Sequence, residues 1–268
     1  MLRPPVAIAS ELDCTGSTAT STAGCNEEFA GLFWSTVQVQ PTGTGYIDSF
    51  LRIQRNTLEE GMNSDYRPLE LDEITDPNYT RDIQLGEIRQ VTFDPDGDGP
   101  SGAITYYELL LDINEPDAST KSLLTLVGLK LCTSSTGMQY DETGGSCDDG
   151  GSAAVEQYSL DGIADNQVKL DYNYLGTGSG GSDLFVYIPV SLLGTDPNTY
   201  LYLWSQFGWL DGDDWKSQDG FEEWAARIGT GGDTPLPNPE APEPASLVLF
   251  GTGLAIAGLR FRRGRKRA

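Results

Sequence analysis

The alternation of short apolar runs with clusters of turn-forming residues constrains the fold of residues 27–229 more than any other feature. Gly, Asp, Asn, Pro and Ser gather between the runs, as the turns of a sheet protein require. No apolar pattern with the period of a helix, about 3.6 residues, extends over about twelve residues of this body. A period of two, typical of a half-buried antiparallel strand, runs through Val168, Leu170, Tyr172 and Tyr174. The pattern therefore predicts an all-β domain.

The apolar runs give the predicted strands directly. We expect strands at residues 32–40, 46–54, 82–93, 103–113, 122–132, 154–160, 167–174, 184–190 and 199–207. One further segment, 221–228, has the composition of a short helix. About nine or ten strands over about 200 residues predict a single β-sandwich of the jelly-roll type.

The composition changes abruptly at the C-terminal end. Five of the 13 residues from 232 to 244 are proline, which fixes the backbone and predicts an extended linker. Residues 245–259 carry no charge, and six of the 17 basic residues follow in the last nine positions. A helix over 245–259 would span about 22 Å, which suits a transient, tilted insertion into the inner membrane better than a permanent anchor. The basic end predicts a cytoplasmic C-terminus. The alternative is a core helix followed by a basic terminus.

The body is strongly acidic. Without the basic end and Glu243, residues 1–242 hold 11 basic and 39 acidic residues, a net charge of −28. Such a surface argues against nucleic acid as a partner, because phosphates are bound by basic surfaces. The chain contains no His, which excludes a Ser-His-Asp triad, a His-paired cysteine nucleophile and a His-ligated zinc.

The end of the chain resembles a known sorting signal. Pro242-Glu243-Pro244, the apolar span 245–259 and the arginine-rich end follow the order of the PEP-CTERM signal of exported bacterial proteins. The resemblance implies recognition by an exosortase, cleavage near Pro-Glu-Pro, and release or attachment at the surface of a cell that makes extracellular polysaccharide. The same tail has been labelled an ice-binding-protein C-terminal domain, a label that says nothing about ice binding by this body.

Two further features bear on export. An exported protein of this kind is expected to carry an N-terminal signal, and Ala7-Ile8-Ala9 has the small-x-small form of a cleavage site. We therefore expect residues 1–9 to be the remnant of a signal peptide from a longer reading frame. Residues 42–54, 107–115, 182–193, 200–208 and 219–225 resemble a recurrent β-rich ectodomain that precedes such tails and has no assigned activity.

The four cysteines form two locally spaced pairs, Cys14 with Cys25 and Cys132 with Cys147. Neither spacing is that of a CxxC motif. In an exported chain we expect two short-range disulfides, although four cysteines allow three connectivities. Four buried free thiols are the alternative.

One acidic loop has the pattern of a calcium site. Asp94, Asp96 and Asp98 alternate and are followed by Gly99, so that three carboxylates could converge on one hard cation. A distant acid such as Glu108 or Asp112 would complete the shell. The alternative is an acidic hairpin turn without a metal. Calcium is the only cofactor that the sequence suggests.

Two other site classes are weaker. Glu222 and Glu223 are adjacent, so on a strand they face opposite sides and do not make a catalytic pair; we therefore expect no enzyme. Aromatic residues from 200 to 224, among them Trp209 and Trp215, could stack on sugar rings. Their alternative role is the core, because Leu201 and Leu203 make both faces of that strand apolar.

The sequence thus predicts four parts, namely an N-terminal segment 1–26, an ectodomain 27–229, a linker 230–241 and a sorting signal 242–268. We expect a protein that is membrane-associated through 245–259 before processing and then lies at the cell surface or outside the cell. Its expected role is that of a structural or adhesive component of the surface or matrix. A carbohydrate-binding module for secreted polysaccharide is the second hypothesis, and a secreted glycoside hydrolase is the third.

Overall fold

The computed structural model describes most of the predicted ectodomain. The described residues are 10–15, 25–36, 47–69, 71–95, 102–115, 121–139, 147, 154–162, 165–172, 184–208, 215–218 and 220–227. All of them belong to the first of the chain's two units, Met1–Thr230, and none to the second, Gly231–Ala268. The predicted signal remnant, linker and sorting signal therefore lie outside the described residues.

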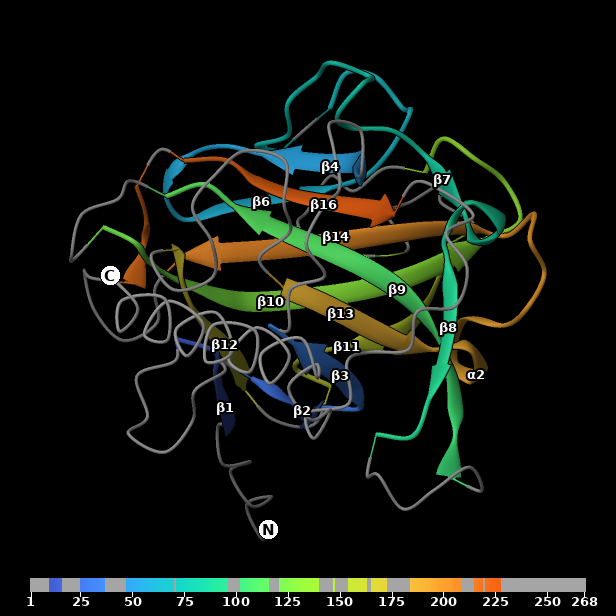
Figure 1. Ribbon diagram of the computed structural model, residues 1–268. Helices are drawn as coiled ribbons and strands as arrows, with labels where there is room; N and C mark the ends of the chain where they lie inside the picture. The colour runs from blue at the N-terminus through green and yellow to red at the C-terminus, as the bar shows by residue number, and fades with distance from the viewer. Residues whose placement is uncertain are drawn as a thin grey trace, which may run out of the picture. The chain divides into compact units, whose positions relative to one another are not determined.

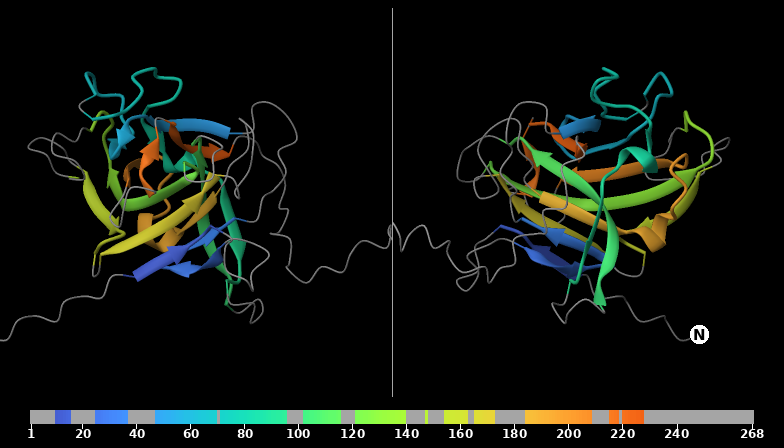
Figure 2. Two further views of the ribbon diagram at one scale, coloured as in Figure 1. Left: turned by 90° about the vertical axis from the view of Figure 1, so that its left-hand side faces the viewer. Right: turned by 45° about the vertical axis from the view of Figure 1, so that its right-hand side comes forward.

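Two seven-stranded sheets make up most of this unit (Figures 1 and 2). Sheet A runs in the order β1 (Ser10–Asp13), β12 (Asn166–Asp171), β10 (Leu123–Ser134), β14 (Tyr200–Gly208) and β6 (Glu59–Met62), with β11 (Val155–Ser159) beside β10 and β7 (Ile83–Gln84) beside β14. Sheet B runs in the order β2 (Asn26–Phe29), β3 (Leu32–Ser35), β13 (Leu184–Pro189), β9 (Ile104–Ile113), β16 (Glu222–Arg227) and β4 (Ile47–Ile53), with β8 (Gln90–Phe93) beside β9.

Three smaller elements complete the described part. A two-stranded ribbon pairs β15 (Ser217–Gln218) with β5 (Asn56–Thr57). A 3-10 turn η1 (Leu85–Glu87) follows β7, and a single helical turn α2 (Val190–Leu193) follows β13. No helix in the described ranges is long and apolar enough to cross a membrane.

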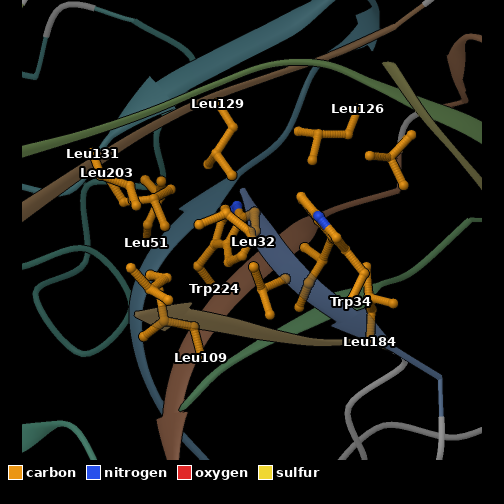
Figure 3. Packing of buried hydrophobic residues seen from close by; sticks show 14 of the residues in the cluster. Leu32, Trp34, Leu51, Leu109, Leu126, Leu129, Leu131, Leu184, Leu203 and Trp224 are labelled. Carbon is orange, nitrogen blue, oxygen red and sulfur yellow. The ribbon is translucent and has the colours of Figure 1, made fainter. Parts of the chain in front are cut away.

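The two sheets share one hydrophobic core because each strand alternates its side chains between two faces. In β13, for example, Leu184, Val186 and Ile188 belong to this shared core, whereas Phe185 and Tyr187 are buried on the other face of the strand. Figure 3 shows Trp34 and Trp224 between leucines contributed by both sheets. A core drawn from both sheets confirms the prediction of a mostly β body.

A short segment joins the two sheets at one edge. The amide of Asp72 donates to the carbonyl of Glu60 in β6 over 3.0 Å, and the amide of Ile74 donates to the carbonyl of Arg52 in β4 over 2.8 Å. Gly61 is needed here, since a Cβ at this position would lie 2.4 Å from Cγ2 of Ile53. Strands β6 and β4 therefore come close together although they belong to different sheets.

Most predicted strands are confirmed, although β3 and β12 end earlier than expected, at Ser35 and Asp171, and β1, β2 and β6 lie outside the predicted ranges. Two further predictions differ in kind. Residues 82–93 do not form one strand, because η1 separates β7 from β8. The helix predicted at 221–228 is wrong, since Glu222–Arg227 is strand β16, which pairs with β4 on one side and β9 on the other. Two ladders of backbone hydrogen bonds and the burial of Trp224 and Ala226 outweigh the local helix propensity.

Both local disulfides are present. Cys14 bonds to Cys25, and Cys132 bonds to Cys147, as the spacing favoured. The first bond lies at the main core, and the second lies in a smaller cluster on the opposite face of sheet A, with Met62, Tyr202 and Trp204. The first bond therefore joins the end of β1 in sheet A to the start of β2 in sheet B.

Candidate functional site

Two buried glutamates from different sheets meet at one end of the core. Glu59 begins β6 of sheet A and lies opposite Phe207, and Glu222 begins β16 of sheet B and lies opposite Ile53. Glu222 faces inward because it shares the parity of Trp224, two positions along the strand. Both glutamates are 0% exposed. The strand pattern therefore places two acids where the neighbouring positions are apolar.

The two carboxyl groups interact, since a side-chain hydrogen bond between them lowers the pKa of Glu59 and raises that of Glu222. One oxygen of Glu59, Oε2, accepts from the backbone amide of Arg55 over 2.6 Å. The other oxygen, Oε1, and both oxygens of Glu222 have no N–H or O–H donor in the described part of the chain. Since two ionised carboxylates only accept, a hydrogen bond between them requires a proton on one of them.

The ribbon of β5 and β15 covers this end of the core. Ser217 in β15 donates its hydroxyl to the carbonyl of Arg55 over 2.7 Å, and the amide of Gln218 donates to both oxygens of Glu115 at 3.0 Å each. Gly220 allows the close approach of the chain, because a Cβ there would lie 2.1 Å from the carbonyl oxygen of Asn114. The carboxyl pair is thus enclosed.

The environment of the pair favours the protonated forms. Burial, followed by the charge of Glu59, raises the pKa of Glu222 well above its ordinary value, and Glu115 and Asp112 act in the same direction. Burial also raises the pKa of Glu59, although its hydrogen bonds to Glu222, the Arg55 amide and Ser217 oppose that shift. An enclosed pair of this kind can hold a proton, but it offers no open face to a substrate.

Glu223 lies on the opposite face of β16, as the adjacency of the two glutamates predicted. It accepts a hydrogen bond from the guanidinium group of Arg52, which in turn lies over the ring of Tyr79, 3.5 Å from its centroid, and near the ring of Phe221 at 4.4 Å. Burial raises the pKa of Glu223, and Arg52 opposes the shift. This cluster is a packed ion pair, and it leaves Glu222 and Glu223 unable to act together.

The calcium loop is described only at its first ligand. Asp94 is half-buried beside Gly102, whereas Asp96 and Asp98 lie outside the described residues. Of the two acids expected to complete the shell, Glu108 is 3.8 Å from Arg89, and Asp112 adds to the charge near Glu222. Within the described ranges, no group of three or more acids or cysteines is arranged to hold a metal ion.

The two tryptophans proposed for sugar stacking differ in what the structure describes. Trp209 lies outside the described residues, and Trp215 is half-buried. The ammonium group of Lys169 lies 4.7 Å from the ring centroid of Trp215 and 2.8 Å from the carboxylate of Glu11. By contrast, Tyr202 and Trp204 of β14 are buried, which confirms the core role for that strand.

The carboxyl pair is the feature that the sequence did not predict. The available signal is a charged residue, Glu222, two positions before Trp224 and therefore on the same face of a strand. The strand face is not evident from the sequence, because the composition of residues 221–228 predicts a short helix. Glu59 carries no comparable signal, since its strand is short and half polar.

The comparisons with known proteins place the end of the chain in a recognised class. Neither the curated proteins nor the solved structures give a match to the chain. Residues 240–263 match the family model described as the PEP-CTERM protein-sorting motif. This motif includes Pro242, Glu243 and Pro244 and confirms the sorting signal inferred from the sequence. The chain therefore carries the C-terminal signal of an exported protein that is sorted by an exosortase and processed at the membrane.

Proposed function

We propose that the chain is a structural or adhesive component of the cell surface or extracellular matrix, released from its sorting signal by an exosortase. The observation that carries the proposal is the PEP-CTERM motif at residues 240–263, which follows a disulfide-bonded β body in the sequence. We propose further that this body is a single jelly-roll-like β-sandwich, since both sheets contribute to one core. Two disulfides suit a protein that must last in an oxidising exterior.

A non-catalytic role is supported by the internal contacts of four glutamates in the described part of the body. Glu222 and Glu59 are enclosed, Glu223 is held by Arg52, and Glu115 accepts two bonds from Gln218. Catalytic carboxylates must reach a substrate and stand apart on either side of it. These carboxylates instead complete internal contacts.

Membrane association and calcium are further parts of the proposal. The uncharged segment 245–259 and the basic residues behind it would hold the precursor in the inner membrane until cleavage. Calcium at Asp94, Asp96 and Asp98 would stiffen one loop, and it would also screen a body whose net charge is −28 over residues 1–242, with 11 basic and 39 acidic residues.

A second candidate, binding of secreted polysaccharide, is supported by the surroundings of Trp215. Its ring lies beside Lys169, which pairs with Glu11, and Gln167 donates to Glu11 over 2.6 Å. An aromatic ring beside charged and amide groups is the usual composition of a small polar-ligand site. Loss of binding to secreted polysaccharide on Trp215→Ala, with an unchanged Tm, would support this candidate.

The main proposal is tested by changing the motif in a cell that contains an exosortase. With Pro242, Glu243 and Pro244 all replaced by Ala, we expect the full-length precursor to stay in the membrane fraction while the wild-type body reaches the surface or medium. The matched control replaces Pro235, Pro237 and Pro239, three prolines of the linker outside the motif, and should be processed normally. Normal processing of the motif variant would contradict the proposal.

A further inference from the structure

We propose that Glu59 and Glu222 share one proton and thereby form a pH-sensitive clamp between the two sheets. Glu59 belongs to β6 of sheet A and Glu222 to β16 of sheet B, so a bond between them joins the sheets directly. Both glutamates belong to the folded body, so a proton shared between them does not depend on the proposed export.

The geometry requires a hydrogen that the described groups do not supply. Both side chains are 0% exposed and interact with each other, yet Glu59 Oε1 and both oxygens of Glu222 have no donor in the described structure. Leaving buried carboxylate oxygens without a partner is strongly unfavourable. A single proton converts the contact into an O–H···O⁻ bond, which is among the stronger hydrogen bonds in proteins.

The other charged groups near the pair are almost all acidic. Glu115 and Asp112 act on Glu222, and Asp72 acts on Glu59. Arg55 approaches Glu59 through its backbone amide, while its guanidinium group pairs with Asp72 at 3.1 Å and is 65% exposed. A second negative charge on the pair would therefore add to a negative surrounding, which favours a shared proton.

A proton explains the site better than a metal ion does. Calcium takes about six to eight oxygen ligands. The pair supplies two carboxyl groups, and the described residues contain no group of three or more acids arranged for a metal. The backbone N–H of Arg55, which donates to Glu59, directs the positive end of its dipole at this carboxylate and so disfavours a cation there.

The expected pH dependence follows from the direction of the shifts. The pKa of the folded pair is raised above the ordinary glutamate value of 4.5, so the folded state holds a proton that the unfolded chain releases. Folding is therefore favoured most below that ordinary value, and the contribution falls as the pH rises through the folded pKa. Above it the clamp carries two charges, and the contact between β6 and β16 weakens.

The test compares Glu222→Gln with the wild type in the full chain, in EDTA, by thermal unfolding at about pH 5 and about pH 9. We expect the Tm of the wild type to fall over this range and that of the variant to fall by less than half as much. At the higher pH the variant should be the more stable protein, because its neutral amide can donate to Glu59. Equal pH slopes of the Tm in the two proteins would overturn the clamp. The other carboxyl groups with a raised pKa are present in both proteins, so their contributions cancel in the difference.

Two controls keep the test decisive. Glu223→Gln changes the adjacent, outward-facing acid, and it should lower the Tm but reduce the pH slope less than Glu222→Gln does, because Arg52 opposes the rise in the pKa of Glu223. If Glu222→Gln does not fold, calorimetry of the wild type near neutral pH in buffers of different ionisation enthalpy counts the protons released on unfolding. The same measurement on Glu59→Gln should give a smaller release, which supports the proposal, whereas an equal release contradicts it. A Tm rise on adding calcium at high pH that Glu222→Gln abolishes would assign the site to a cation instead.

Discussion

Trp224 donates its indole Nε1–H to the hydroxyl of Ser205 over 3.0 Å, and this bond joins β16 of sheet B to β14 of sheet A. Both residues are 0% exposed. Because a buried indole N–H without a partner is unfavourable, the single hydroxyl lets sheet B place its central tryptophan against sheet A. The same strand carries Glu222, whose proposed bond to Glu59 would be a second polar link from β16 to sheet A.

The Trp224–Ser205 bond is expected to contribute measurably to stability. Ser205→Ala should lower the free energy of unfolding by about 1–3 kcal/mol, because it leaves the indole N–H unsatisfied in the core. Urea unfolding of the variant and the wild type measures the difference.

A double-mutant cycle with Trp224→Phe isolates the bond from the loss of volume. Phenylalanine removes the donor, so Ser205→Ala should be less destabilising in the Phe background than in the wild type. Equal effects of Ser205→Ala in both backgrounds would show that the bond contributes nothing.

Among the basic residues of the described body, Arg52 is expected to cause the largest loss of stability when it is replaced. Arg52→Ala should destabilise the protein by about 3 kcal/mol, because it removes the partner of Glu223 and uncovers the rings of Tyr79 and Phe221. Chemical unfolding near neutral pH gives the value. Arg55→Ala is the control, since that guanidinium is 65% exposed and its pair with Asp72 should contribute less than about 1 kcal/mol.

The sequence predicts the strands whose two faces are both apolar. The predicted ranges for β9, β10 and β14 agree with the structure to within about two residues at each end, since a long apolar run between turns leaves little choice. Strand β16 is missed because Glu222–Arg227 contains good helix formers, and only its position between β4 and β9 decides its structure.

The carboxyl pair could not be predicted for a different reason. Glu59 and Glu222 meet only because the segment 71–74 brings β6 beside β4 while β16 pairs with β4. Such contacts depend on the register of distant strands, which local patterns do not encode. The disulfides were predictable because each joins cysteines only 11 or 15 positions apart.

The disulfides are expected to stabilise the body to a similar degree. Replacing Cys14 and Cys25 by Ser, or Cys132 and Cys147 by Ser, should each lower the free energy of unfolding by about 3 kcal/mol. The main reason is that the unfolded chain gains conformational entropy when the bond is absent. Denaturant unfolding under non-reducing conditions measures both. A reducing agent should then lower the stability of each variant further through the remaining bond, and no further change would mean that this bond contributes nothing.

Calcium is expected to raise the melting temperature if the loop from Asp94 to Asp98 binds it. A ligand that binds only the folded state must stabilise it, so millimolar calcium should increase the Tm of the wild type. Asp96→Ala should abolish the increase, while magnesium at the same concentration controls for screening of the acidic surface. An unchanged Tm in calcium would remove this ion from the account.

The central claim is that an acidic, disulfide-bonded body is exported and separated from its basic tail. The intact mass of the protein recovered from the surface or medium of the producing cells tests this claim most directly. We predict a chain that ends near Pro242-Glu243-Pro244, lacks residues 245–268 and is lighter by four hydrogens than its reduced form, as two disulfides require. A recovered protein that still carries the basic end through Ala268 would contradict the account.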